Sequence, residues 1–293
     1  RGSSVLVPLS TGGSLPPVFA VPGVFGNVVG FEALARELGS EQPFYGLQSV
    51  GLDGKEAPLD SIGEMAKLYV KGVRSIQQRG PYAIIGACFG ATVAYEVTRQ
   101  LLEEGEEVAF LGLLSPTDRD GNGDNDNHAS APRAYRRTIA LGCLLTDRLR
   151  LYLKDMQGLT NSDRVKYLTK KILSLGASIA DKNRFGGAWR ELNQIEVYRA
   201  NIIALDCYQR KPLQGRLRVL EIFHPVLPGH EVQEPIEWNK LWKGCTKIHH
   251  VRGKDSGDML SGKNVRAIAA LLKERLRATL GDESTKRAQD LKA

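Results

Sequence analysis

The chain has 293 residues, of which 42% are hydrophobic and 25% charged, so it can bury a large core as one domain or as one domain with an insertion. No apolar stretch is long enough to span a bilayer, and the N-terminus has no signal-peptide core, which argues against membrane insertion and export. The net charge is +7, but Lys and Arg are scattered without a nucleic-acid-binding motif; we expect no nucleic-acid or membrane partner, and an acidic protein partner explains the charge equally well.

The four cysteines, Cys88, Cys143, Cys207 and Cys245, are far apart and form no CxxC pair. This spacing indicates neither a zinc site nor a disulfide framework, so we expect no bound metal. Unpaired cysteines of this kind favour a reducing cytoplasm as the location of the protein.

The first half of the chain alternates strand-like and helix-like segments. Apolar runs of strand length fall at 16–21, 43–51, 82–87 and 108–116, and segments with apolar residues at helical spacing fall at 31–39, 62–80 and 91–105. Such an alternation predicts an α/β fold in which a mostly parallel sheet carries helices on both faces.

The second half begins with a polar, glycine-rich loop at 118–130. Three long helical segments follow at about 132–156, 162–181 and 187–209, and strand signals return only at 216–225 and 246–253, before a last helix at 264–281. We therefore expect residues 1–116 and 213–282 to form the α/β core and residues 117–212 to form an inserted helical lid. Residues 283–293 are predicted to be a polar tail.

Residues 86–90 read GACFG and join a strand-like run to a helix-like run. This is the pattern of a nucleophile elbow, with Cys88 where serine is usual. Gly86 and Gly90 let the backbone turn tightly, and a helix that starts at Phe89 directs its positive end at residue 88. That end favours a thiolate, so we expect the pKa of Cys88 to fall below its ordinary value of about 8.5. A buried and inert cysteine is the alternative.

Several segments together resemble a known family. LVPLSTGGSLPPVFAVPGVFGN at 6–27, QPFYGLQSVGLDG at 42–54, the elbow region 80–114 and NVRAIAALLKERL at 264–276 are similar to the terminal thioesterase domains of polyketide synthases and nonribosomal peptide synthetases. The resemblance implies the α/β-hydrolase fold. It also implies a substrate that is an acyl chain carried on the 4'-phosphopantetheine of an acyl or peptidyl carrier protein, with the rest of the assembly-line polypeptide as a further partner and no cofactor of the domain's own.

The catalytic triad of that family falls on changed residues here. Its serine falls on Cys88, its aspartate on Ser115, and its histidine on Asp255, or on Ser256 if the loop is aligned one residue later. The oxyanion of an attacked thioester would accept the backbone N–H of Phe89 and, from the turn PGVFGN, that of Val24. Neither donor depends on a side chain, so the changed triad leaves the oxyanion hole possible.

Candidate bases lie at the ends of the later strands. We expect Asp255, or a pair of His224 and Asp255, to act as base, with His224 at the end of its strand; His230 is a weaker candidate in the next loop. A histidine that only caps the strand end is the alternative for His224. Ser115 could orient a base by hydrogen bonding, although a neutral hydroxyl cannot stabilise an imidazolium as a carboxylate does.

These residues predict an acyl-transfer enzyme. Exchange of a pantetheine thioester for a thioester on Cys88 swaps one thiol for another of similar acidity and needs little base, whereas activation of water needs a strong one. Release of the chain by cyclisation or by a second nucleophile is thus favoured over simple hydrolysis. Two alternatives remain open: a catalytically inactive docking or structural domain, and a cyclase that acts without an acyl-enzyme.

Overall fold

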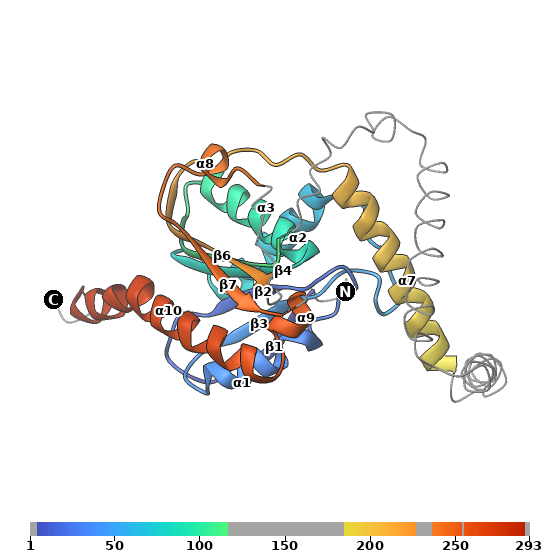
Figure 1. The fold of residues 1–293 in the computed structure, drawn as a ribbon, viewed down its shortest axis with the longest axis horizontal. Helices are drawn as coiled ribbons and strands as arrows, with labels where there is room; N and C mark the ends of the chain where they lie inside the picture. Colours follow the sequence, from blue (N-terminus) through green and yellow to red (C-terminus); the bar gives the residue numbers. More distant parts are fainter. Residues whose placement is uncertain (1–4, 117–184, 227–235, 254, 291–293) are drawn as a thin grey trace.

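The computed structural model describes residues 5–116, 185–226, 236–253 and 255–290. Its centre is a seven-stranded sheet with the order β1-β3-β2-β4-β5-β6-β7 (Figure 1). The strands are β1 (Leu6–Ser10), β2 (Val18–Val21), β3 (Phe44–Leu47), β4 (Tyr82–Ala87), β5 (Glu107–Leu114), β6 (Arg216–Val226) and β7 (Thr246–Arg252). The predicted α/β architecture is confirmed.

The sheet is parallel except at one edge. β1 pairs antiparallel with β3, while every other neighbouring pair runs parallel. The sequence pattern did not identify β1, because none of its residues is fully buried and the apolar alternation is lost. It also contains Pro8, which lacks an N–H for a second partner strand and is compatible with an edge position.

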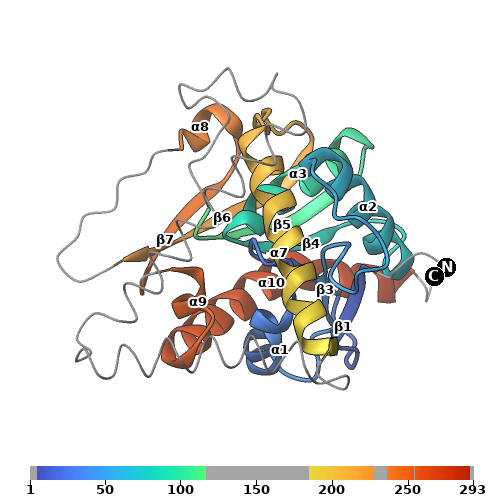
Figure 2. The ribbon, with the colours of Figure 1, turned by 90° about the vertical axis from the view of Figure 1, so that its right-hand side faces the viewer.

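Helices cover both faces of the sheet (Figures 1 and 2). The described helices are η1 (Val29–Phe31), α1 (Glu32–Leu38), α2 (Ile62–Ile76), α3 (Phe89–Glu103), α7 (Phe185–Asp206), α8 (Trp238–Leu241), α9 (Ser256–Met259) and α10 (Gly262–Asp290). Helices α2 and α3 pack together on one face, and α1 and α10 pack together on the other.

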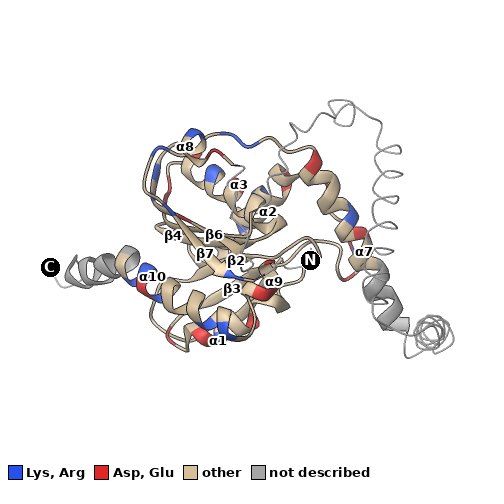
Figure 3. Cartoon of the chain, viewed as in Figure 1, with Lys and Arg blue, Asp and Glu red and all other residues tan. Residues whose placement is uncertain are grey.

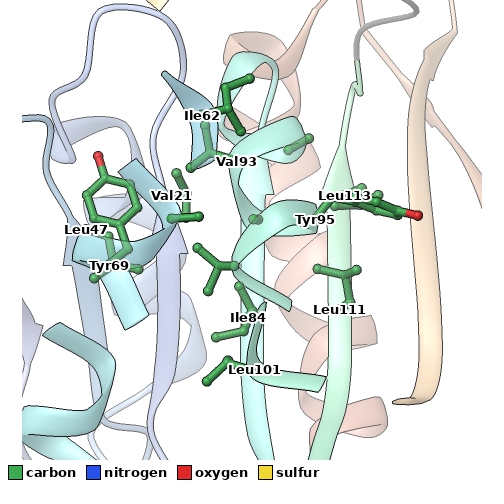
Figure 4. Close-up of a cluster of buried hydrophobic side chains, with 14 of the residues drawn as sticks. Val21, Leu47, Ile62, Tyr69, Ile84, Val93, Tyr95, Leu101, Leu111 and Leu113 are labelled. Atoms are coloured by element: carbon green, nitrogen blue, oxygen red, sulfur yellow. The ribbon is translucent and has the colours of Figure 1, made fainter. Parts of the chain in front are cut away.

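Each face has its own hydrophobic core. Between the sheet and α2 and α3 lie fully or nearly buried side chains that include Val21, Ile84 and Tyr95 (Figure 4). The second cluster lies on the α1 and α10 face and includes Phe110 and Phe223. Burial of the central strands on both faces explains why their sequences read as continuous apolar runs.

Helix α7 takes the place of the predicted helix 187–209 and is anchored to α3 by the residues that follow it. The Tyr208 hydroxyl donates to Glu96 Oε2 at 2.8 Å, and the Tyr95 hydroxyl donates to the carbonyl oxygen of Lys211 at 2.9 Å. The helix crosses the side of the molecule where the central parallel strands end (Figures 1 and 2). The other two predicted lid helices, 132–156 and 162–181, lie outside the described residues.

One sequence-based boundary is wrong and another agrees to within one residue. Helix α10 continues to Asp290, through most of the segment predicted to be a polar tail, since sequence polarity alone does not end a helix. Strand β6 ends at Val226, one residue beyond the predicted 225, so His224 lies two residues before the end of its strand.

Charged residues of both signs are interspersed on the described surface, as α1 and α7 show (Figure 3). None of the described helices combines the length and the apolar character needed to cross a bilayer. In the described ranges no three His, Cys, Asp or Glu side chains are grouped as metal ligands.

Candidate active site

Cys88 occupies the turn between β4 and α3 in a conformation that is rare for a residue other than glycine. Its φ is 54° and its ψ is −122°. The Cys88 N–H donates to the carbonyl oxygen of Leu114 at 2.8 Å, and the Cys88 carbonyl oxygen accepts the N–H of Ala91 at 2.9 Å. These bonds tie the turn to β5 on one side and to the first turn of α3 on the other, which holds the strained backbone in place.

The two glycines of the elbow are required by close backbone approach. A Cβ on Gly86 would overlap the carbonyl oxygen of Gly90, and a Cβ on Gly90 would overlap the carbonyl oxygens of Val21 and Pro22. Because these neighbours are backbone atoms, no side-chain movement can make room. The start of α3 therefore lies directly against the end of β2.

The loop after β2, residues 22–27, lies beside the thiol. An ideal Cβ on Gly23 would be 3.9 Å from the Cβ of Cys88, which is ordinary van der Waals contact. Val24 follows Gly23 directly, so the structure brings both predicted oxyanion donors to the elbow: Val24 from this loop and Phe89 from the first residue of α3. The Phe89 N–H also interacts with the sulfur of Cys88.

The expectation of a lowered thiol pKa is wrong. Burial raises the pKa of Cys88 above its ordinary value; the N–H of Phe89 acts in the opposite direction, and the negative charge of Asp255 adds to the rise. Desolvation therefore outweighs the helix N-terminus. The resting thiol is protonated at neutral pH, so its attack on a thioester requires a group that takes the proton.

Ser115 follows β5 and shares the unusual backbone of Cys88. Its φ is 50°, and these two are the non-glycine residues with positive φ in the described part of the chain. The Ser115 N–H donates to the carbonyl oxygen of Phe223 at 2.7 Å, which fixes the turn against β6. Conformations of this kind cost about 1–3 kcal/mol each and collect at functional sites, so their occurrence at two candidate site residues supports a site here.

Asp255 is exposed and lies just after β7, at the start of α9. Its Oδ1 accepts the N–H of Asp258 at 2.9 Å and so caps the helix. Among the described side chains, Asp255 is the one whose charge acts on the Cys88 thiol. Ser256, the alternative alignment of the family histidine, is the first residue of α9.

His224 is 7% exposed and lies within β6. Its ring meets the ring of His250 on β7 edge to face, with 6.4 Å between the ring centroids. Since β5 separates β6 from β4, and neighbouring strands lie about 4.8 Å apart, His224 is farther along the sheet from the elbow than Ser115 is. His230 lies outside the described residues.

Asn201 is a residue of the site that the sequence did not indicate. It lies on α7, is 1% exposed, and donates from Nδ2 to the carbonyl oxygen of Val24 at 2.8 Å. A single asparagine in a long helix carries no signal of such a contact, because its partner is 177 residues away in the sequence.

Comparison with known proteins places the chain among thioesterase domains, whose family it matches over residues 16–276. It is similar to indigoidine synthase of Dickeya dadantii (strain 3937), with 42% identity over 113 residues, which are 39% of this chain and 8% of that protein. It is also similar to malpibaldin synthetase of Mortierella alpina, with 39% identity over 114 residues, which are 39% of this chain and 2% of that protein. The chain thus spans a small fraction of the length of these curated relatives.

Solved structures share the fold. A four-domain nonribosomal peptide synthetase, holo-AB3403 bound to AMP and glycine, matches with a TM-score of 0.65 and 22% identity over 93% of this chain and 20% of that one. The Vlm2 thioesterase domain, bound with a dodecadepsipeptide, matches with a TM-score of 0.58 and 19% identity over 92% of this chain and 96% of that one. The α/β-hydrolase fold predicted from the sequence is confirmed.

Proposed function

The chain belongs to the thioesterase domain family, and from this premise we propose that it is a chain-release domain of a polyketide synthase or nonribosomal peptide synthetase that uses Cys88 as its nucleophile. The substrate is an acyl or peptidyl chain on the 4'-phosphopantetheine of a carrier protein, which is the partner together with the neighbouring domains of the assembly line. We place the domain in the cytoplasm and assign residues 117–212 to a helical lid, of which α7 is the described helix.

The observation that carries this proposal is the geometry of Cys88. Cys88 has the strained backbone of a nucleophile elbow, and the glycines on either side of it leave no room for a side chain. This backbone is present although cysteine replaces the usual serine. Residues held in strained backbone conformations cluster at functional sites, which favours a chemical role for Cys88. The backbone N–H groups of Phe89 and Val24 beside it are suited to bind a developing oxyanion.

Acylation of Cys88 is a balanced thiol exchange. The base takes the proton of the Cys88 thiol as the sulfur attacks the carbonyl carbon of the pantetheine thioester. A carbon–sulfur bond to Cys88 forms, the carbon–sulfur bond to pantetheine breaks, and the base returns the proton to the departing thiolate. No net charge or redox change occurs, and the two thioesters are close in free energy.

Asp255 is our candidate for that base. Its charge acts on the thiol, and because its Oδ1 accepts the N–H of Asp258 in the cap of α9, Oδ2 is the atom that we assign to receive the proton. A pair with His224 is the second candidate; His224 faces His250 from within β6, at a greater distance from the elbow along the sheet. Ser115 supplies a hydroxyl at the end of β5, which lies between the elbow strand β4 and the strand β6 that carries His224.

Release of the chain needs a second nucleophile. Water is a poor acid, and its attack on an acyl-cysteine needs strong base assistance. A hydroxyl, an amine or a stabilised carbanion that is already bound next to the acyl-cysteine reacts with help from proximity alone. We therefore propose that cyclisation or chain fusion by C–O, C–N or C–C bond formation exceeds hydrolysis.

Intact-protein mass spectrometry with acyl-pantetheine thioesters tests this function. The experiment uses a variant in which Cys143, Cys207 and Cys245 are serine, since Cys207 and Cys245 are exposed and would react nonspecifically. We expect one acyl adduct that disappears in Cys88→Ala. Product without an adduct would favour a cyclase that acts without an acyl-enzyme, and neither adduct nor product would favour an inactive docking domain.

A further inference from the structure

The loop after β2 is held from two sides. Within the loop, the N–H of Gly26 donates to the carbonyl oxygen of Gly23 at 2.8 Å, and the carbonyl oxygen of Gly26 accepts the N–H of Ser49 at 2.9 Å. From outside the loop, Nδ2 of Asn201 on α7 donates to the carbonyl oxygen of Val24 at 2.8 Å. The loop is therefore fixed both by its own turn and by a helix from a distant part of the chain.

These bonds fix the two peptide planes that flank Val24. In a trans peptide the C=O and the N–H point in opposite directions. Because the Gly23 carbonyl points at Gly26 inside the turn, the N–H of Val24 in the same plane points out of the turn. The bond from Asn201 fixes the next plane, which contains the Val24 carbonyl. With both planes held, the direction of the Val24 N–H is set.

Asn201 suits this task because it is buried and its helix fits the loop closely. Its side chain is 1% exposed, so loss of its donor would leave the Val24 carbonyl without that partner in a place with little water. One turn earlier on α7, Val197 packs so close to Gly26 that an added Cβ there would lie 2.7 Å from its Cγ1. The ring of Tyr198 packs on Phe25 with 5.3 Å between the centroids.

We propose that Asn201 is a positioning residue for acylation: through its bond to Val24 it holds the second oxyanion donor beside Cys88, and it makes α7 part of the catalytic machinery. This inference rests on the proposed function, because it assigns Asn201 a role in the attack of Cys88 on a thioester. Asn201 contacts the loop through the Val24 carbonyl oxygen, and the role that we assign to it needs no contact with the substrate.

The test compares two reactions of the same thiol. Transacylation by an acyl-pantetheine thioester passes through an oxyanion, whereas alkylation by iodoacetamide does not. In the variant with serine at Cys143, Cys207 and Cys245, we expect Asn201→Leu to slow acylation of Cys88 at least tenfold while the alkylation rate changes less than twofold. Asn193→Leu is the matched control, since Asn193 also donates from α7 to a backbone carbonyl, that of Leu52, but away from Val24.

The outcomes separate this inference from the proposed function. Absence of an acyl adduct on Cys88 in the variant that keeps Asn201 would overturn both the proposed function and the role of Asn201. An adduct that forms at the same rate in Asn201→Leu, or equal losses of acylation and alkylation, would overturn the role of Asn201 alone. If Asn201→Leu does not fold, Asn201→Ala removes the donor without a larger side chain; it must show the same selective loss of acylation for the inference to stand.

Discussion

The carboxyl edge of the sheet has two halves that differ in what builds them. The elbow half, at the ends of β2 and β4, consists of backbone: the turn at Cys88, the glycines around it, and the N–H groups of Phe89 and Val24. The other half, at the ends of β5, β6 and β7, carries the side chains that we propose for proton transfer, Ser115, His224 and Asp255, and we call it the proton-transfer half. The first half keeps both glycines of the elbow pattern, with cysteine in place of serine, while the second has Ser115 and Asp255 at the positions where the resemblance implies an aspartate and a histidine.

This difference shows which part of such a site tolerates side-chain substitution. Backbone donors depend on the path of the chain, which glycines and long-range hydrogen bonds fix, so side-chain exchange leaves them in place. Proton transfer depends on side-chain acidity, and each exchange alters it. A thiol is more acidic than an alcohol and therefore needs less assistance from a base. A retained elbow is thus chemically compatible with a changed base.

The largest effect should follow from breaking the elbow half. Gly90→Ala places a Cβ against the backbone of β2, and we expect a loss of about 3 kcal/mol in the free energy of unfolding together with loss of the Cys88 adduct. Thermal denaturation and mass spectrometry measure the two effects. Gly30→Ala is the control, because a Cβ there meets nothing within 4 Å; equal behaviour of the two variants would contradict the packing argument.

A smaller effect should follow from breaking the proton-transfer half. Asp255→Asn removes the proposed base but keeps the cap of α9, because asparagine caps helices as well as aspartate does. We expect acylation of Cys88 at pH 7 to slow more than tenfold without loss of stability. His224→Ala should change the same rate less than threefold.

Asp258→Asn is the control for a lost charge on α9. If His224→Ala slows acylation as much as Asp255→Asn does, the two residues act as a pair, and Asp255 is not the base by itself.

The pH dependence of Cys88 reactivity measures the effect of Asp255, in the proton-transfer half, on the thiol in the elbow half. Because the pKa of Cys88 is raised, the thiolate fraction at pH 7 is below that of an ordinary cysteine and increases as the pH rises beyond about 8.5. Alkylation of Cys88 by iodoacetamide should therefore accelerate through this range. In Asp255→Asn the midpoint should move to lower pH, since a negative charge that opposes the thiolate is gone; an unchanged midpoint would show that Asp255 does not act on the thiol.

The smallest effect is expected at Ser115. Glycine accepts a φ of 50° without strain, so Ser115→Gly should change the free energy of unfolding by no more than about 0.5 kcal/mol. A β-branched side chain resists this conformation, and Ser115→Val should cost about 1–2 kcal/mol. Chemical denaturation measures both, and equal stabilities would mean that the turn relaxes away from this backbone.

The sequence predicted most of the sheet because its elements carry local signals. The apolar runs that became β2, β4 and β5 and the helical spacing of α2 and α3 were recognisable by themselves. Where the local signal was weak, prediction failed. Strand β1 lacks apolar alternation, and the polar residues after 281 do not end α10, which continues to Asp290. The end of β6 was predicted to within one residue, because its apolar run continues to Phe223 and Pro225 follows His224.

The sequence by itself determined the elbow, because only glycine fits where backbones approach so closely and the pattern of residues 86–90 is read without any distant contact. The tertiary structure decided the chemistry around it. Burial reversed the expected direction of the Cys88 pKa, since desolvation depends on everything packed around the sulfur. It also joined Asn201 to Val24, a contact that exists only once α7 lies across the end of the sheet.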